Sequence, residues 1–350
     1  MTPATMGTPA VEVKEASGKK MPPPVVMLAG LTAGLGAILI LLLMVFILPS
    51  LKSGAHDLRV GVVGAPAAAG LLEQSLATAA PDAYEPQRYD SEAALRDAIE
   101  NREVVGGFVV DEAGVHALVA SAGSASISGN LTGTAQALGQ ATGEKVTVED
   151  VVPLPEGDPT GIGIGGLAFP LVFGGIVPVV AFRKIFPRSS GWYLTGLVTF
   201  SAVGGFVVAS MLTFGFGSIE TGLWSTTFWA VAGSIALGIA ALAIPLAGLQ
   251  NAFGAKGFTI GAMVMMFLGN PLAGIAGSAA WLPSGLGTVG QILPPGAAGT
   301  LVRSAAYFGG AGGLTAGLTL VTWIVVGLVL FVTGMRRAAV STPEAVELAS

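Results

Sequence analysis

Histidine and cysteine, which most often bind metals or act as nucleophiles, are nearly absent from this sequence. Its 350 residues include no cysteine and only two histidines, His56 and His116. The two histidines lie far apart in the chain and have no cysteine partner for a zinc site. The sequence therefore predicts no metal site, no disulfide and no cysteine nucleophile.

One glycine-rich motif matches a nucleotide-binding pattern by spacing alone. Residues 161–166, GIGIGG, fit G-x-G-x-x-G, but no strand precedes them. Arg183 lies near the place, about 20 positions later, where this chemistry needs an acidic residue. The chain also contains no G-x-x-x-x-G-K-[ST] P-loop and no G-x-S-x-G nucleophile motif. We therefore predict that the chain is not an enzyme and holds no cofactor.

Composition decides the class of protein. Charged residues make up 11% of the chain, against about 25% in a typical soluble domain. Apolar residues make up 52%, and the mean hydropathy is +0.76. Such a chain has too few polar side chains to cover a water-exposed surface, so it predicts an integral membrane protein. The net charge of −5 argues against nucleic-acid binding.

Apolar runs long enough to cross the bilayer occur six times. A hydrocarbon core of about 30 Å needs about 20 helical residues, and the first run, 25–48, is uncharged throughout. A cleaved signal peptide is the alternative for this run, but its apolar part would be only about 7–15 residues long. The other runs lie at about 162–182, 192–217, 224–249, 257–280 and 311–335.

Residues 51–160 differ in kind from the rest of the chain. They hold 16 of the 21 acidic residues and 6 of the 16 basic ones, a net charge of −10. Patterns typical of strands and amphipathic helices alternate, which predicts a small α/β domain. We expect strands at 59–63, 104–110, 115–120 and 145–148, and helices at 68–79, 92–100 and 131–138.

The predicted fold is thus an α-helical integral membrane protein with six transmembrane helices and an α/β domain inserted between the first two. Five segments follow from this: a cytoplasmic tail at 1–22, transmembrane helix 1 at 23–50, the α/β domain at 51–160, a five-helix membrane domain at 161–337, and a cytoplasmic tail at 338–350.

Basic residues orient the predicted helices. Nine of them fall on one side of the membrane if the spans alternate, and the positive-inside rule makes that side the cytoplasm. Both termini are then cytoplasmic, residues 51–160 are extracytoplasmic, and the protein lies in the plasma membrane. The nine are Lys14, Lys19, Lys20, Arg183, Lys184, Arg188, Lys256, Arg336 and Arg337.

Small residues recur at helical spacing in two of the runs. Gly30 and Gly34 lie in the first run, and Gly309, Gly313 and Gly317 follow one another at intervals of four near the last. Small residues allow helices to approach closely in lipid. We predict that these glycines form helix-packing faces, either within the chain or across a homodimer.

The stretch 270–310 is irregular. Its pieces are too short to cross the bilayer, so we predict re-entrant or interfacial helices at the outer face. Its one charge, Arg303, either extends to the interface or contacts an anionic head group or the acidic domain. Upstream, Asp158-Pro159 predicts an N-cap with proline at the first helical position. The breaks in the irregular stretch fall at Asn270, Pro271, Trp281, Pro294 and Pro295.

This layout resembles the ABC-2 type transporter permease superfamily, over about residues 25–335. The irregular stretch is similar to the segment before the last span in the YhgE/Pip (phage infection protein)-like branch, a bacterial group. Residues 151–161 are similar too. The segments that carry the resemblance are GNPLAG at 269–274, WLP at 281–283, GQILPPGA at 290–297 and RSAAYF at 303–308.

The resemblance implies a dimeric membrane subunit that works with a separate cytoplasmic ATPase. In such exporters the loop between spans two and three contacts the ATPase, which here implicates Arg183, Lys184, Phe186 and Arg188. The alternative for this loop is membrane anchoring by its basic residues alone. Residues 1–22 depart from the family because they lack the apolar periodicity of an interface helix.

Two functions from different classes remain open. In the first, the chain is the permease subunit of an exporter whose cargo is apolar or amphipathic, because no ionisable residue falls mid-span. In the second, it is a non-transporting scaffold or surface receptor, whose acidic domain binds a partner. The expected partners are the lipid bilayer, the ATPase and a second copy of the chain, with no nucleic acid.

Overall fold

The computed structural model describes residues 23–340, so the predicted tail at 1–22 and most of that at 338–350 lie outside the described residues. The chain divides into two units, one ending at Leu43 and the other beginning at Met44. The described part of the first unit belongs to helix α1 (Pro24–Leu51), which matches the first predicted span.

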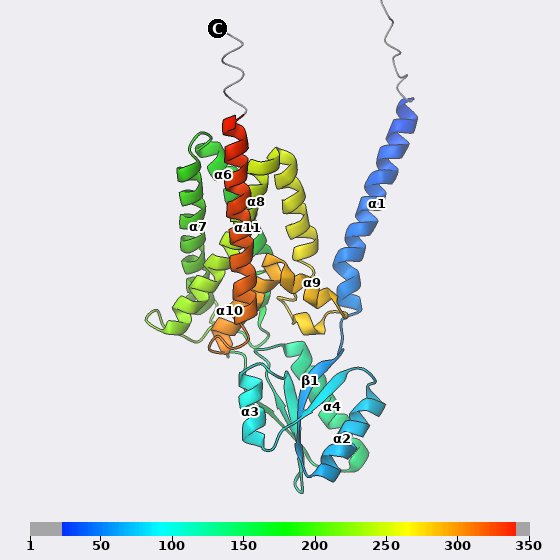
Figure 1. The fold of residues 1–350 in the computed structure, drawn as a ribbon. Helices are drawn as coiled ribbons and strands as arrows, with labels where there is room; N and C mark the ends of the chain where they lie inside the picture. The colour runs from blue at the N-terminus through cyan, green and yellow to red at the C-terminus, as the bar shows by residue number, and fades with distance from the viewer. Residues whose placement is uncertain (1–22, 341–350) are drawn as a thin grey trace, which may run out of the picture. The chain divides into compact units, whose positions relative to one another are not determined.

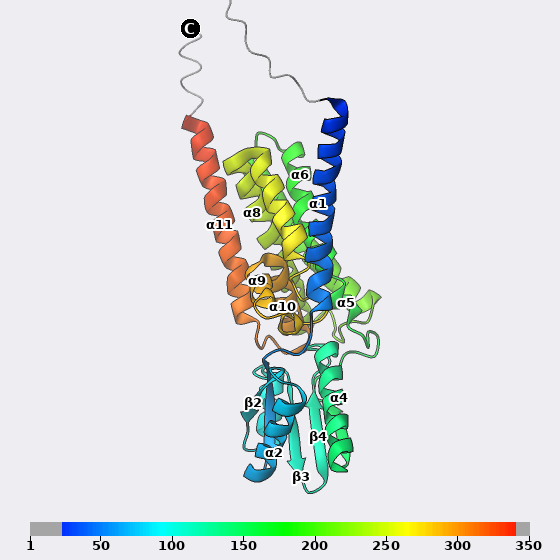
Figure 2. The same ribbon diagram turned by 90° about the vertical axis from the view of Figure 1, so that its right-hand side faces the viewer.

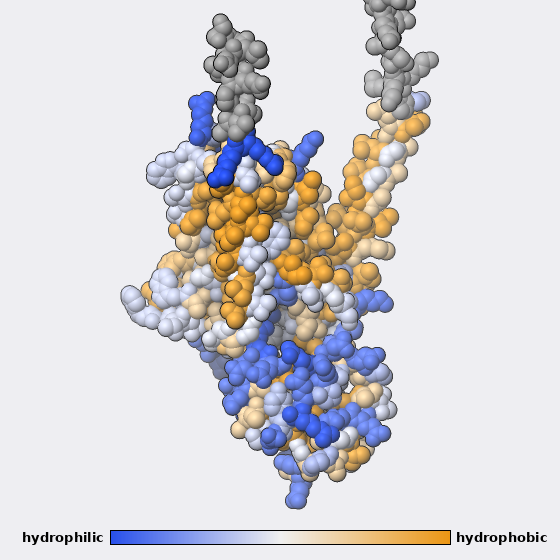
Figure 3. Space-filling view, viewed as in Figure 1, coloured by the Kyte–Doolittle hydropathy of each residue, from blue (hydrophilic) through white to orange (hydrophobic). Residues whose placement is uncertain are grey.

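Within residues 23–340, five helices are long and apolar enough to cross a membrane. In the second unit, hydrophobic residues cover the middle of the helices, and hydrophilic ones gather beyond them (Figure 3). The chain is therefore a membrane-embedded helical protein, as its composition predicts. The five candidates are α1, α5 (Ile162–Gly165) with α6 (Ala168–Ile185), α7 (Ser190–Ser210) with η1 (Met211–Gly215), α8 (Thr226–Val264) with η2 (Met265–Gly269), and α11 (Leu314–Val340).

The predicted fourth and fifth spans fall within one candidate, α8 with η2. Gly254 interrupts this helix with φ 68° and ψ −156°, a backbone conformation that glycine adopts without steric penalty. The second leg, residues 255–269, folds back beside the first (Figures 1 and 2). At about 1.5 Å per residue it is about 22 Å long, shorter than a hydrocarbon core of about 30 Å. A sixth crossing therefore stays a prediction.

Glycines bring α8 and α11 into close contact. A Cβ on Gly248 would lie 2.3 Å from the carbonyl oxygen of Gly327, so the two backbones touch. The predicted packing face in the last helix is wrong in part, because α11 begins at Leu314. Gly309, with φ 58°, and Gly313 precede it in a turn, and only Gly317 is helical. The packing role of Gly30 and Gly34 in the first unit stays a prediction.

The α/β domain is built on one five-stranded sheet in the order β2-β1-β3-β4-β5, in which only the β3–β4 pair is antiparallel. Helices α2 and α4 contribute to one hydrophobic core and α3 to another, so they cover opposite faces (Figure 1). The predicted α/β domain is confirmed, with one strand missed. Its elements are β1 (Leu58–Gly64), α2 (Pro66–Ala79), β2 (Tyr84–Arg88), α3 (Glu92–Glu100), β3 (Gly106–Asp111), β4 (Gly114–Val119), α4 (Ala125–Thr142) and β5 (Val146–Asp150).

Acid should weaken the contact between α3 and β5. The Arg96 guanidinium hydrogen-bonds Glu92 at 2.7 Å and Glu149 at 2.6 Å, and its bonds to Glu149 hold the pKa of that carboxyl below its usual value. The pKa of Glu149 is lower in the folded chain than in the unfolded chain. The pairing of Glu149 with Arg96 therefore stabilises the fold fully above the usual Glu pKa, and this stabilisation is lost as pH falls through the folded pKa. We expect the protection of amide hydrogens in α3 and β5 against exchange, relative to their intrinsic rates, to fall as pH falls below about 4.

Arg96→Gln should remove most of this pH dependence. The comparison is made with the parent at each pH, which cancels the intrinsic exchange chemistry. Arg88→Gln is the matched control, because Arg88 pairs with Glu73, outside this contact. Equal pH dependence in the parent and Arg96→Gln would show that this ion pair does not hold the two elements together.

Candidate functional site

The chain between η2 and α11 forms short helices. They are η3 (Ala279–Trp281), α9 (Leu286–Ile292) and α10 (Pro294–Tyr307). The longest, α10, has 14 residues and so spans about 21 Å, less than the bilayer core. Pro294 and Pro295 occupy the first turn of α10, where a missing N–H costs nothing. We call residues 270–310 the outer segment.

Small residues let α10 lie deep against α8. A Cβ on Gly238 of α8 would lie 2.7 Å from the Ala298 side chain, and one on Gly269 would lie 2.9 Å from the Pro295 ring. Almost all residues from Pro294 to Ala305 are buried.

Arg303 projects from α10 and is 8% exposed. Its guanidinium donates to the carbonyl oxygens of Gly277 at 2.9 Å and Ile275 at 2.7 Å, which ties the preceding loop to α10. Burial, and then the charge of Arg102 nearby, lower the pKa of Arg303 to about 10. Extension to the membrane interface is therefore the wrong expectation for this side chain.

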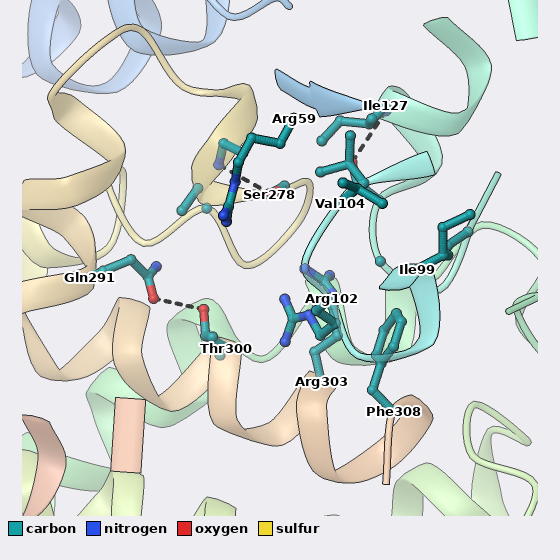
Figure 4. A pocket seen from close by; sticks show the side chains of 18 residues that line it. Arg59, Ile99, Arg102, Val104, Ile127, Ser278, Gln291, Thr300, Arg303 and Phe308 are labelled. Carbon is teal, nitrogen blue, oxygen red and sulfur yellow. Dashed lines mark hydrogen bonds between the residues drawn. The ribbon is translucent and has the colours of Figure 1, made fainter. Parts of the chain in front are cut away.

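Two arginines of the α/β domain face the same cavity as Arg303 (Figure 4). Arg102, between α3 and β3, places its guanidinium 5.1 Å from the centre of the Phe308 ring. Arg59, on β1, is exposed and lies across the cavity from Arg102. The cavity measures about 260 Å³ and is lined by both the α/β domain and the outer segment.

The remaining lining of this cavity is neutral. Gln291 accepts a 2.7 Å hydrogen bond from the Thr300 hydroxyl and donates one of 3.2 Å to the carbonyl of Ala273, so it is held in place (Figure 4). Ser124 and Ser278 contribute hydroxyls, and no carboxylate of the described part of the chain lines the cavity. Its three guanidiniums can bind an anion. The described residues contain no cluster of His, Cys, Asp and Glu suited to a metal.

An apolar groove of about 540 Å³ lies beside α5, the start of α6 and η1. Leu167, Pro170, Met211 and Phe216 contribute to its lining. One wall, η1, is a π-helical turn, a feature frequent at functional sites. The side chains of Asp158 and Ser218 are the polar ones in its lining. This groove suits an alkyl chain or another apolar group.

The carboxylate of Asp158 caps α5 from a distance. It accepts hydrogen bonds from the backbone N–H groups of Ile162 and Gly163, at 2.8 and 2.7 Å. The N-cap residue itself is Gly161, with φ 69°. The expected N-cap at Asp158, with Pro159 in the first helical position, is therefore wrong in position, because the chain turns once more before α5 begins.

The other predicted site residues fall in two separate places. Arg183, Lys184, Phe186 and Arg188 come together at the α6–α7 connection, away from the α/β domain (Figure 1), with Arg183 5.7 Å from the centre of the Tyr193 ring. Asn270, Pro271 and Trp281 lie in the outer segment, where Asn270 is buried and the carbonyl of Trp281 accepts from the N–H of Gly54.

Arg59 and Arg102 were not anticipated from the sequence. Both lie in a charged domain, where nothing local marks them as facing a cavity. Comparisons of the chain with protein-family models, curated proteins and solved structures find no match. Function therefore has to be argued from the cavities, the charges and the membrane helices themselves.

Proposed function

We propose that the chain is the membrane subunit of an ABC-2-like exporter that moves an apolar or amphipathic cargo. The observation that carries this proposal is the apolar groove beside α5, α6 and η1, about 540 Å³ in volume. Pockets of about 300–1,000 Å³ enclose ligands of drug size. An apolar groove within candidate membrane spans can hold the apolar part of such a cargo while it passes between leaflets.

Energy for transport would come from a separate ATPase, because the chain has no P-loop. The basic α6–α7 connection is the proposed docking point. Phe186 stacks between Phe182 and Trp192, with ring centres 6.4 Å apart in each pair. This aromatic stack gives the short connection a defined shape. Arg183, Lys184 and Arg188 give it a positive charge, and we place it on the cytoplasmic side, as the positive-inside rule requires.

A second candidate function is that of a surface receptor. It is favoured by a groove of about 720 Å³ between α2 and α4 of the α/β domain. Leu71 at this groove is 66% exposed, and Asn130 and Thr134 place polar groups beside it. Such a groove on an acidic, extracytoplasmic domain can bind a partner without any transport.

Co-purification separates the two candidates. The tagged full chain is isolated from its native membranes in mild detergent, and the accompanying proteins are identified by mass spectrometry. We expect a stoichiometric P-loop ATPase with the parent, and its loss on reversing Arg183→Glu, Lys184→Glu and Arg188→Glu together. An intact parent that brings no ATPase would overturn the exporter proposal and leave the receptor.

The control reverses three other basic residues of the same predicted side, Lys256→Glu, Arg336→Glu and Arg337→Glu. Both triple variants change the net charge equally, so a general effect of charge would appear in both. Protease accessibility of the α/β domain checks that each variant keeps its topology. ATPase lost only from the first variant assigns docking to the α6–α7 connection, and equal loss from both argues against it.

A further inference from the structure

Arginines of the α/β domain fall into two groups. Arg88 pairs with Glu73 at 2.8 Å, and Arg96 pairs with Glu92 and Glu149. Arg59 and Arg102 form no ion pair with any carboxylate of the part that the structure describes, and neither does Arg303 of the outer segment. Among the arginines of the α/β domain and the outer segment, the three without an ion pair line one cavity (Figure 4).

In two of these arginines a buried guanidinium nitrogen has no hydrogen-bond partner. Nη1 of Arg102 and Nε of Arg303 are inaccessible to solvent and have no partner among the described residues. A guanidinium stays charged in proteins, and a buried charge without a counter-charge is costly. Arg102 and Arg303 also repel each other at close range. An anion in the cavity would relieve both costs at once.

We propose that this cavity is a binding site for a phosphate group, held by Arg59, Arg102 and Arg303. Guanidinium groups match phosphate oxygens with paired, charge-assisted hydrogen bonds. A carboxylate offers two oxygens in one plane, whereas a phosphate offers oxygens in several directions. Three arginines converge from β1, the α3–β3 turn and α10, so they suit the oxygens of a phosphate better than those of a carboxylate (Figure 4).

The size of the cavity restricts the ligand. At about 260 Å³ it is smaller than pockets that enclose whole drug-sized molecules, about 300–1,000 Å³. It fits free inorganic phosphate, or the phosphate of a lipid head group whose chains stay outside. These two sources share the same chemistry. The proposal goes beyond the exporter function, because an exporter and a receptor could each carry such a site.

A ligand held there would connect the two parts of the second unit. Arg59 and Arg102 belong to the α/β domain, and Arg303 to the outer segment, where it also holds the carbonyls of Ile275 and Gly277. A ligand that binds only the folded arrangement stabilises it in proportion to its occupancy. Phosphate binding is therefore expected to protect the α/β domain's contact with the outer segment.

The test measures two probes on the purified full chain. Radiolabelled inorganic phosphate is measured by equilibrium dialysis in detergent. Retained phosphatidylglycerol is counted by native mass spectrometry after reconstitution in phosphatidylcholine nanodiscs with or without that lipid. We expect the parent to bind at least one probe, and Arg102→Gln to bind it about tenfold or more weakly, as loss of a charge-assisted hydrogen bond implies. Arg59→Gln should weaken it less, because Arg59 is exposed.

Arg88→Gln is the matched control, with the same charge change in the same domain at a paired arginine. It should bind like the parent. Binding of free phosphate that depends on Arg102 identifies a soluble ligand, and retention of phosphatidylglycerol alone identifies a head group. The proposal is overturned if the parent binds neither probe, or if Arg102→Gln and Arg59→Gln both bind like Arg88→Gln. ATPase co-purification is unaffected by either result, so the two proposals fail separately.

Discussion

Replacing Gly290 by alanine should disrupt the outer segment. Gly290 is buried in α9, and a Cβ there would lie 1.7 Å from the carbonyl oxygen of Leu272 and 2.6 Å from its carbonyl carbon. The obstacle is backbone, which cannot move aside as a flexible side chain can. Overpacking of a close-packed interior typically costs about 1–3 kcal/mol. We expect a loss at or above the top of that range, measured by tryptophan fluorescence during SDS-titrated unfolding in mixed micelles.

Gly290→Ala should have a second effect besides the loss of stability. It should also displace α10, because Gly290 supports that helix. A Cβ on Gly296 would lie 2.3 Å from the Gly290 carbonyl oxygen, so α9 and the first turn of α10 are in backbone contact. Displacement of α9 therefore moves the helix that carries Arg303. Phosphate binding should weaken together with stability if that site exists as proposed.

Gly277→Ala is the control for this prediction. Gly277 lies in the same segment, and a Cβ there would meet no heavy atom within 4 Å. The substitution keeps the carbonyl that accepts from Arg303. Its effect should stay within about 0.5 kcal/mol, as for most substitutions away from packed features. If both alanine variants unfold alike, α9 does not approach Leu272 as closely as described.

The α/β domain was predictable because its signals are local. Strands β1, β3 and β4 are buried apolar runs, and α3 shows the expected 3.6-residue pattern, with Leu95, Ala98 and Ile99 buried. Strand β2 was missed because its sequence, YEPQR, has no apolar alternation and contains Pro86. It lies at the edge of the sheet, where proline is tolerated and one side stays open to water.

The apolar character of the membrane helices was predictable from the sequence, but the number of times that the chain crosses the membrane was less so. Runs 224–249 and 257–280 both read as spans, and the structure joins them through the turn at Gly254. Hydropathy reports how apolar a run is, but not where a helix stops inside the bilayer. The short second leg and the helices of the outer segment depend on tertiary contacts, such as that between Gly269 and Pro295, which no local pattern contains.

The candidate sites show the same division between local and tertiary information. Arg303 stood out because it is the one charge in the apolar stretch 270–310. Arg102 did not stand out in the sequence, because its place at the cavity depends on which side of the α/β domain faces the outer segment. Its positive φ of 60° and its contact with the Phe308 ring arise from tertiary structure. Convergence of charge from distant segments is therefore visible only in the fold.

Replacing Asp158 by alanine should be the second most damaging change. Its carboxylate, 7% exposed, accepts from the N–H groups of Ile162 and Gly163. Two part-buried hydrogen bonds to the carboxylate would be lost, and hydrogen bonds to charged groups contribute about 1.5–3 kcal/mol each. Water that enters beside the apolar groove should satisfy one donor in part. We therefore expect a net loss of about 2–3 kcal/mol, again by SDS-titrated unfolding.

Asp111→Ala separates this local role from a general effect of removing a carboxylate. Asp111 accepts one hydrogen bond, from the N–H of Ala113 at 2.8 Å, in the exposed β3–β4 turn, so its loss should cost no more than about 0.5 kcal/mol. Asp158→Asn should fall between the two, because an amide keeps one acceptor oxygen but turns an NH₂ towards the other donor. This graded order ties the start of α5 to the carboxylate of Asp158. Equal stability of Asp158→Ala and Asp111→Ala would instead mean that the α5 N–H groups find other acceptors, and that the entry into the membrane helices does not depend on this side chain.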